Sequence, residues 1–383
     1  MKRARWFLII GVFALLAAGA IFASAFAAPR APVLQDNPPP QPGIRNDTCL
    51  GCHSKPDQYM TMPNGEKVYI TVSPDNYDQS IHGQSGIACV QCHTNITGYP
   101  HPPTGAQTPR ELTIALTKSC SRCHSGESDL AKQSTHQKAM DDGNLNAAVC
   151  SDCHSAHEVQ PIPEDKLAQK QFAVSTCERC HTAIYHEYVN SVHGDALINK
   201  NNPDVPSCID CHGSHKILGP STNEYFAMFS PLICQKCHAD EQLMSKYDLT
   251  ASTFDTYLSD FHGTSVLLFE PHYAGQQSNK PVCIDCHGVH NMLKPDDPNS
   301  TVYKDNLLAT CKKCHPDAQN NFPTAWLGHY QPDLKRFPLY YFVDLFYKFF
   351  IPAVLGALAF FVAIDVYRRF IRRPKMKTVG KEE

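Results

Sequence analysis

The sequence of 383 residues lacks a strong excess of either charge, because 34 lysines and arginines nearly balance 37 aspartates and glutamates. It also lacks a basic stripe with interleaved aromatic residues, which is the pattern expected of a nucleic-acid-binding protein. Nucleic acid is therefore not among the predicted partners. A third absence concerns cysteine, because none of the 18 cysteines lies outside one short pattern. No thiol is left over for a separate disulfide or thiol site.

That pattern is Cys-x-x-Cys-His, which occurs nine times. Its cysteines are Cys49, Cys52, Cys89, Cys92, Cys120, Cys123, Cys150, Cys153, Cys177, Cys180, Cys208, Cys211, Cys234, Cys237, Cys283, Cys286, Cys311 and Cys314. Its histidines are His53, His93, His124, His154, His181, His212, His238, His287 and His315. In this motif two thiols add to the haem vinyl groups, and the adjacent histidine reaches the iron from the proximal side. The sequence therefore predicts nine covalent c-type haems.

Zinc and disulfides are the two alternative explanations of this cysteine pattern. A Cys-x-x-Cys pair is also half of a zinc ribbon. Ribbons need partner pairs, however, and nine is an odd number of pairs. Disulfides would not require a histidine after every second cysteine. Both alternatives therefore fit the pattern less well than haem does.

Further histidines recur in phase with the motifs. The motifs that begin at residues 120, 177 and 234 are spaced 57 residues apart, which indicates a repeat that holds two haems. One histidine follows each odd-numbered motif: His82, His136, His193, His262 and His329. Another follows each even-numbered motif: His101, His157, His215 and His290. The supply of these histidines equals the number of haems, so all nine irons are predicted to have two axial histidines.

Spacing alone leaves open which of these distal histidines serves which haem. His157, His215 and His290 lie only three residues after a motif histidine. Because so short a link cannot easily reach the opposite face of the same haem, these three are expected to bind neighbouring haems. His186 and His272 fall outside the pattern and are interpreted as surface residues, although either could replace a wrongly assigned partner.

The two ends of the chain predict export and membrane attachment. Residues 1–27 have the basic start, the apolar stretch and the small-x-small site of a signal peptide, or alternatively form a retained N-terminal anchor. Residues 28–48 are a Pro-rich linker. Residues 337–369 are predicted to form an interfacial segment and a transmembrane helix. Residues 370–383 form a basic tail, which the positive-inside rule places in the cytoplasm.

Between these ends, residues 49–336 provide about 32 residues for each haem, which is too few to build an ordinary hydrophobic core. The haems themselves must form the core, with polypeptide wrapped around them. The predicted fold class is mainly α with extensive irregular loops, built from a two-haem repeat and followed by one C-terminal transmembrane helix.

The attachment motifs, the S-x-H-G elements and the CHGxH endings make residues 49–336 resemble multihaem c-type cytochromes. The segment from Trp326 to Arg369 is similar to the tail of membrane-bound multihaem cytochromes that pair with a b-type cytochrome subunit in anaerobic respiration. This resemblance implies an inner-membrane electron-transfer protein with its haem domain in the periplasm. It further implies a quinol-oxidising membrane partner and a periplasmic redox partner.

An enzyme is the competing hypothesis. Multihaem reductases of nitrite, hydroxylamine or a sulfur oxyanion need one haem iron with an open coordination position. Some of them mark it with lysine in place of the motif histidine, whereas all nine motifs here keep histidine. The leading prediction is therefore an electron carrier without catalytic residues.

Overall fold

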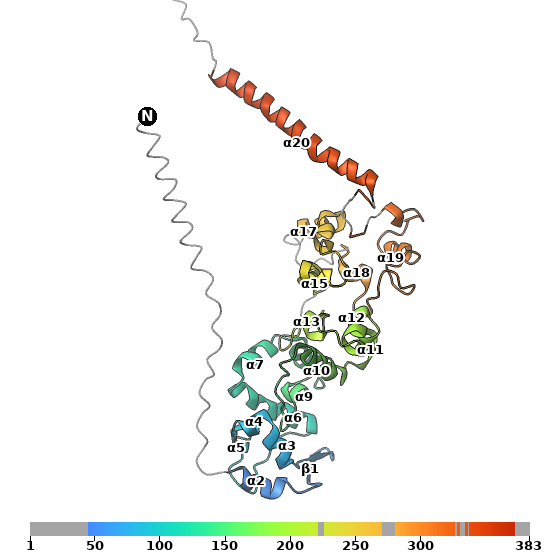
Figure 1. Ribbon diagram of the computed structural model, residues 1–383. Helices are drawn as coiled ribbons and strands as arrows, with labels where there is room; N and C mark the ends of the chain where they lie inside the picture. The colour runs from blue at the N-terminus through green and yellow to red at the C-terminus, as the bar shows by residue number, and fades with distance from the viewer. Residues whose placement is uncertain are drawn as a thin grey trace, which may run out of the picture. The chain divides into compact units, whose positions relative to one another are not determined.

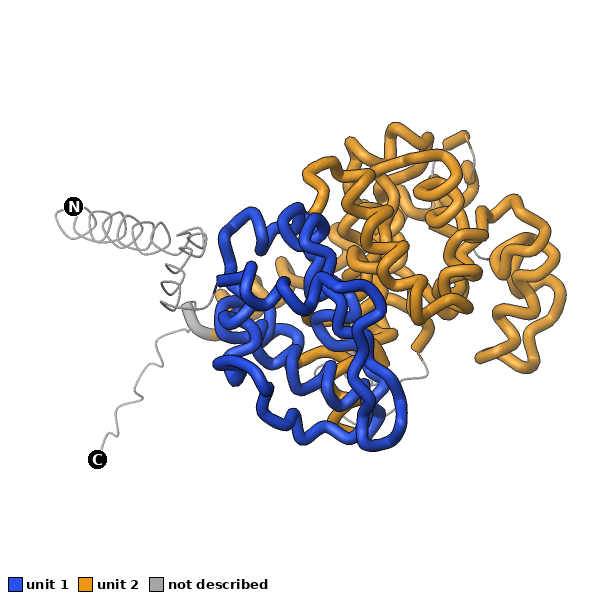
Figure 2. Tube along the Cα trace, turned by 90° about the horizontal axis from the view of Figure 1, so that it is seen from below, with its two compact units in different colours: residues 1–132, 143–161 blue, residues 133–142, 162–383 orange. Residues whose placement is uncertain are grey.

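The computed structural model describes residues 45–220, 226–269, 280–325, 328–329, 334–335 and 337–371. The described chain is mostly helical, with many loops and one small sheet (Figure 1). It divides into two compact units (Figure 2). This architecture confirms the predicted mainly α fold class with extensive irregular segments.

The first unit takes the chain up to residue 132 together with residues 143–161. Its elements are α2 (Asn46–His53), β1 (Tyr59–Thr61), β2 (Lys67–Tyr69), α3 (Pro74–Gln79), α4 (Ile81–Gln84), α5 (Cys89–Cys92), α6 (Pro109–Thr117), η1 (Lys118–Arg122), α7 (Ser125–Ala131) and α9 (Cys150–His154). Strands β1 and β2 pair in antiparallel fashion, with Tyr59 opposite Tyr69 and Thr61 opposite Lys67.

The second unit takes residues 133–142 and the chain from residue 162 onward. Its elements are α8 (Thr135–Asp141), α10 (Lys166–Glu178), α11 (Thr182–Val189), α12 (Val192–Gly194), η2 (Asp195–Asn199), α13 (Cys208–His212), η3 (Phe226–Phe229), α14 (Ser230–His238), α15 (Glu241–Ser245), α16 (Thr253–Ser259), α17 (Phe261–Phe269), α18 (Cys283–His287), α19 (Leu307–Lys312), η4 (Pro323–Ala325), α20 (Pro338–Val366) and η5 (Tyr367–Ile371).

Several helices begin at residues that favour a helix start. The side chains of Ser73, Thr108 and Asp165 each accept a hydrogen bond from a backbone N–H in the first turn of α3, α6 and α10. Such side chains satisfy N–H groups that have no partner inside the helix. Pro74 and Pro109 occupy the first turn, where their missing N–H costs nothing. Local sequence therefore fixes where these helices start.

Apolar packing contributes little to the interior. Among the described residues, one small cluster of buried side chains consists of Met62, Ala106 and Leu112. Leu197 and Val174 are fully buried at other places in the fold. So sparse an apolar interior agrees with the expectation that a polypeptide of this kind wraps around its haems.

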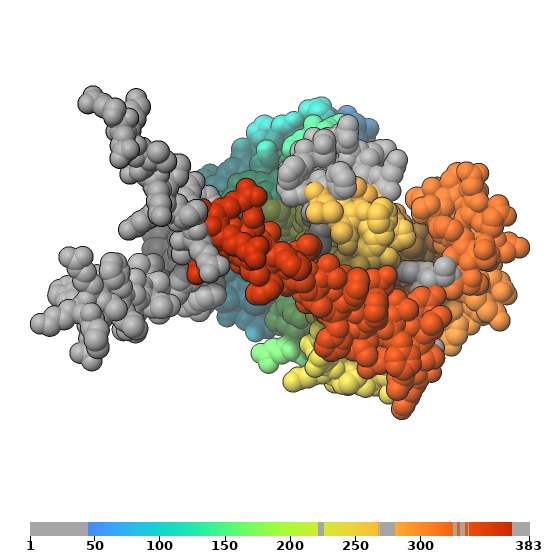
Figure 3. All heavy atoms as spheres, turned by 90° about the horizontal axis from the view of Figure 1, so that it is seen from above, coloured from blue at the N-terminus to red at the C-terminus, as the bar shows by residue number. Residues whose placement is uncertain are grey.

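Helix α20 differs from every other described element in length and polarity. It continues through Pro352, and with the residues after it forms one 32-residue helix, long and apolar enough to cross a membrane. None of its most apolar window is buried within the protein, and its side chains lie at the surface in Figure 3. Near its two ends, Asp344 pairs with Lys348 and Asp365 with Arg369. The carboxylates therefore have cationic partners one helical turn away.

Candidate haem-binding sites

The even-numbered attachment motifs form single helical turns of their own. In α5, α9, α13 and α18, the N–H of the residue before the first cysteine donates a hydrogen bond to the side chain three residues later. The acceptors are Gln91, Asp152, Asp210 and Asp285, at 2.6–2.7 Å. This contact closes the first turn in the manner of a capping box. It explains why a carboxylate or amide stands directly before the second cysteine of these motifs.

The odd-numbered motifs have a different setting, because their first cysteines lie in longer or continuing helical segments. Cys49 lies in α2, and Cys120 lies in η1, which continues α6. Cys177, Cys234 and Cys311 lie in the last turns of α10, α14 and α19. Two structural settings therefore alternate along the chain, in agreement with a repeat that holds two attachment sites.

Consecutive motifs also contact each other through their cysteines. A hydrogen bond between the thiols of Cys120 and Cys150 raises the pKa of Cys120. The equivalent bond to Cys177 raises the pKa of Cys208, and the bond to Cys283 raises the pKa of Cys234. Burial and the neighbouring Cys49 raise the pKa of Cys89 to about 11. Each of these contacts joins an odd-numbered motif to the even-numbered motif that follows it.

Eight motif histidines each lie opposite a second imidazole. The ring centres are 6.0–6.3 Å apart in the pairs His53–His101, His82–His124, His93–His157, His136–His181, His193–His238, His212–His290, His262–His315 and His287–His329. Every pair joins one motif histidine to one of the repeat-phased histidines. The sequence prediction placed the same two groups on opposite sides of an iron.

This separation fits a single metal ion between two imidazoles. A metal–imidazole bond is about 2.0 Å long, and a ring nitrogen lies roughly 1.1 Å from the ring centre at ordinary bond lengths. Two rings on opposite sides of one ion would therefore place their centres about 6.2 Å apart. The observed separations of 6.0–6.3 Å agree with this value. The donor set thus fits haem iron with two axial histidines.

The orientation of several rings also suits a metal ligand. Nδ1 of His53 lies 2.8 Å from the carbonyl oxygen of Ile70, and Nδ1 of His212 lies 2.7 Å from that of Leu218. Because a carbonyl only accepts hydrogen bonds, Nδ1 must donate, which leaves Nε2 with its lone pair free for a metal. Burial lowers the pKa of His193 to about 4, so that ring is neutral near pH 7, the form that binds metals.

Six of the eight pairs follow one rule along the chain, and the pairs His53–His101 and His287–His329 depart from it. The histidine after an odd-numbered motif faces the motif histidine two motifs downstream, as His82 faces His124. The histidine after an even-numbered motif faces the one two motifs upstream, as His157 faces His93 and His290 faces His212. A backbone hydrogen bond of 2.9 Å between Ile81 and Val159 also joins the segments that carry His82 and His157.

The chain is similar to known multihaem cytochromes. Residues 81–182 match the model of the cytochrome c3 family, and the matched range contains four complete attachment motifs. The chain contains a multihaem c-type cytochrome domain. Over 215 residues it is 23% identical to the multiheme cytochrome MtrA of Shewanella baltica (strain OS185). That match takes 51% of this chain and 53% of the relative, so the chain spans about half the length of the curated relative. No solved structure matches the chain.

Four histidines that the sequence analysis considered lie outside these eight ring pairs. His154 ends α9, and His215 follows α13; both have interaction partners, and their ligation stays a prediction from sequence. His186 lies on α11, with its ring 5.6 Å from that of Tyr185. His272 lies outside the described residues.

Sequence reasoning missed a set of tyrosines that supports these sites. Tyr77, Tyr188 and Tyr257 each stand five residues before a repeat-phased histidine. Their hydroxyls donate hydrogen bonds to backbone carbonyls near the next attachment motif. The recurrence of tyrosine at this spacing is the signal that could have found them.

Proposed function

We propose that this chain is a membrane-anchored electron carrier that holds nine c-type haems, each with two axial histidines. The observation that carries the proposal is the set of eight imidazole pairs, with ring centres 6.0–6.3 Å apart. Each pair combines the motif histidine of one haem with a repeat-phased histidine. The ninth site follows from the remaining motif at Cys150, Cys153 and His154.

When bound, haem iron exchanges one electron between its ferric and ferrous states. The protein side chains have three tasks in this function. The cysteines would hold each haem covalently, and the two histidines of each pair would both bind its iron, so that no position would remain for a substrate. The proximity of Cys120 to Cys150, of Cys177 to Cys208 and of Cys234 to Cys283 would bring successive attachment sites close together. Electrons would pass from one site to the next along the chain.

The proposed location is the inner membrane, with the haem domain in the periplasm and the C-terminus in the cytoplasm. The length and polarity of α20 support the anchor. The signal peptide predicted for residues 1–27 supports export, which covalent haem attachment outside the cytoplasm also requires.

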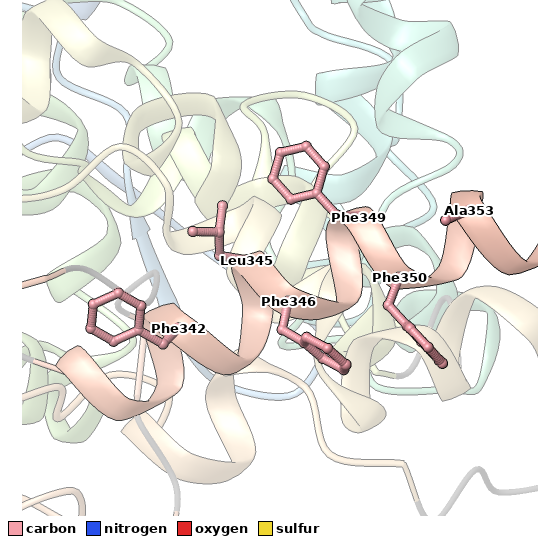
Figure 4. Close-up of a pocket in the computed structure, with 6 residues that line it drawn as sticks. All are labelled: Phe342, Leu345, Phe346, Phe349, Phe350 and Ala353. Atoms are coloured by element: carbon pink, nitrogen blue, oxygen red, sulfur yellow. The ribbon is translucent and has the colours of Figure 1, made fainter.

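The proposed donor is an integral membrane subunit that oxidises quinol, such as a b-type cytochrome, and the proposed acceptor is a periplasmic redox protein. One apolar, mostly aromatic surface of α20 supports a membrane contact. It is formed by Phe342, Leu345, Phe346, Phe349, Phe350 and Ala353 (Figure 4). Phenylalanine side chains on this surface point outward from the helix, where lipid or a neighbouring subunit would contact them.

Spectroscopy of the purified protein tests the haem assignment. A pyridine haemochrome assay combined with intact mass is expected to give nine haems per chain. Low-temperature EPR of the oxidised protein is expected to show only low-spin ferric signals. A high-spin ferric signal that shifts when nitrite or cyanide is added would contradict the carrier and favour the reductase.

Purification from membranes tests the proposed partner. The full chain, tagged and solubilised in detergent, is expected to co-purify with an integral membrane protein that reduces it in the presence of quinol. A matched variant that ends at Phe337, before α20, should lose this partner but keep its haem spectrum. Recovery of the full chain alone, with quinol oxidation retained, would reject the partner.

A further inference from the structure

Three tyrosines make the same contact in three repeats. The hydroxyl of Tyr77 donates a hydrogen bond of 2.5 Å to the carbonyl oxygen of Ile87, two residues before Cys89. The hydroxyl of Tyr188 donates at 2.6 Å to the carbonyl of Pro206, two residues before Cys208.

Tyr257 repeats this contact, with a bond of 3.1 Å to the carbonyl of Pro281, two residues before Cys283. In each case the acceptor carbonyl lies in the segment directly before an even-numbered attachment motif. Each tyrosine therefore contacts the segment that leads into the cysteines of one predicted haem site.

A glycine lies close to the backbone carbonyl of each of these tyrosines. Gly83, Gly194 and Gly263 directly follow the distal histidines His82, His193 and His262. A Cβ atom on these glycines would lie only 1.9–2.1 Å from the backbone carbonyl oxygen of the tyrosine in the same repeat. Only glycine permits so close an approach of the two helices.

A serine joins the same backbone in two of these repeats. The buried Ser80 hydroxyl accepts a hydrogen bond from the N–H of Gly83, and that of Ser191 does the same for Gly194. The backbone N–H groups of these serines donate to the carbonyls of Tyr77 and Tyr188. The distal histidine thus lies on a short helix whose start is bonded to the tyrosine backbone.

Two of the five histidines that follow odd-numbered motifs, His136 and His329, lack both the tyrosine and the glycine, and around His329 the corresponding residues are Thr324 and Tyr330. At the corresponding positions around His136, Ala131 replaces the tyrosine and Gln137 replaces the glycine. Ser134 still caps the helix by accepting from the N–H of Gln137. Tyrosine and glycine are therefore present together or absent together, which indicates that each tyrosine–glycine pair acts as one structural unit.

Each tyrosine–glycine pair connects two different predicted haem sites. His193 faces His238 of the seventh motif, whereas Pro206 precedes the sixth motif. Tyr77 relates the third and second motifs in the same way, and Tyr257 relates the ninth and eighth. Each tyrosine bridges a distal ligand of one site and the attachment segment of the site before it.

We propose that Tyr77, Tyr188 and Tyr257, each with its partner glycine, are positioning residues that hold a distal histidine on its iron at a fixed place relative to the neighbouring haem. This inference rests on the proposed haem ligation. Removal of the hydroxyl should loosen the histidine, and removal of the glycine should displace it.

The glycine is tested by Gly194→Ala in the full, haem-loaded chain. We expect nine haems per chain and the appearance of one high-spin ferric haem by EPR, because the methyl group displaces His193. Added imidazole should restore the low-spin signal, since only the ligand is missing. The matched control is Gln137→Ala, at the position where the chain already accepts a side chain. That variant should stay entirely low-spin.

The tyrosine is tested by Tyr188→Phe, which keeps the ring and removes one hydrogen bond. Carbon monoxide binds a ferrous haem with two histidines only after one of them dissociates. We expect one haem of the variant to bind carbon monoxide about fivefold faster than in the unmodified protein. Tyr69→Phe is the control, because Tyr69 is 71% exposed on β2. It should leave the rate unchanged.

The outcomes separate the two proposals. An unmodified protein with fewer than nine haems, or with a high-spin haem of its own, would contradict the proposed function. Nine low-spin haems with no spectral change in Gly194→Ala and no faster carbon monoxide binding in Tyr188→Phe would overturn the positioning role alone. If Gly194→Ala fails to fold, the more conservative Tyr188→Phe variant still tests the positioning role.

Discussion

His157 stands three residues after His154 in the sequence, yet its imidazole faces His93, with ring centres 6.1 Å apart. Ser155, which directly follows His154 and begins the link to His157, has a positive φ of 58°. Gly213 and Gly288 occupy the same position in later repeats, with φ of 81° and 82°. This left-handed residue turns the chain away from the motif helix, so the second histidine is directed to another site.

The cross-pairing of His157 can be tested by removing haems one at a time. His157→Ala is expected to create one high-spin haem, detected by EPR. The same substitution should have no further effect when Cys89 and Cys92 are both replaced by alanine, because its partner haem is then absent. Replacement of Cys150 and Cys153 instead should leave the new high-spin signal in place. The reverse pattern would show that His157 serves the haem of its own motif.

Ser155 is also a site where stability can be gained. A residue with a side chain at positive φ carries a strain of roughly 1 kcal/mol that glycine avoids. Ser155→Gly is therefore expected to stabilise the haem-loaded protein by about 1 kcal/mol, measured by chemical unfolding. The matched variant is Ser54→Gly, at a helix end where φ is −83°. It should be neutral or destabilising, because glycine only adds freedom to the unfolded chain there.

At the scale of elements, polar side chains attach the helix that leads into an odd-numbered motif to the even-numbered motif after it. Arg110 on α6 bonds both carboxylate oxygens of Asp152 on α9, at 3.0 and 2.9 Å, and also bonds the carbonyl of Ala147. Lys170 on α10 contacts Asp210 at 3.6 Å and bonds the carbonyl of Val205. Asp152 and Asp210 thus close their own helical turns and anchor a second helix.

The importance of this attachment is tested by Arg110→Met. The side chains of Arg110 and Asp152 are only 24% and 31% exposed, so the substitution leaves a half-buried carboxylate without its cation. We expect a loss of about 2 kcal/mol in the free energy of unfolding. Lys132→Met is the control, since its pair with Asp129 is 64% and 70% exposed. That change should stay within about 0.5 kcal/mol.

Helix α20 carries its own prediction. A chain that ends at Phe337 is expected to remain in solution without detergent, with an unchanged visible spectrum, because the haem sites lie before this helix. The full chain should partition into phospholipid vesicles, because α20 exposes a long apolar surface. Vesicle flotation measures both. Equal partitioning of the two proteins would contradict a role of α20 in membrane attachment.

The sequence predicts some levels of this molecule well and others not at all. The attachment motifs, the supply of histidines and the long C-terminal helix follow from local patterns, and so does the mainly helical class. The pairing of His136 with His181 joins residues 45 positions apart, and no local pattern encodes such a contact. The Tyr188 hydroxyl bond was missed for the same reason, because its acceptor is a backbone carbonyl.

At the scale of the whole molecule, stability should depend on haem. The largest apolar cluster described in the first unit consists of Met62, Ala106 and Leu112 with two partly buried neighbours. So small a cluster cannot offset the conformational entropy lost on folding. A chain produced without haem attachment is therefore expected to lack a cooperative unfolding transition and to be digested rapidly by protease. The haem-loaded chain under the same conditions should resist digestion. Equal resistance would contradict a core made of haem.

The pairing rule has a consequence for how such a chain can change in length. Under this rule most sites would take their second histidine from a motif two positions away, which would leave the first and the eighth motif without one. His101 instead faces His53 of the first motif, and His329 faces His287 of the eighth. In the proposed function these two histidines would act as end caps, comparable to the terminal repeats of a solenoid. Duplication of one internal two-haem unit in the gene would leave both caps valid, so descendants of this chain should gain or lose haems two at a time.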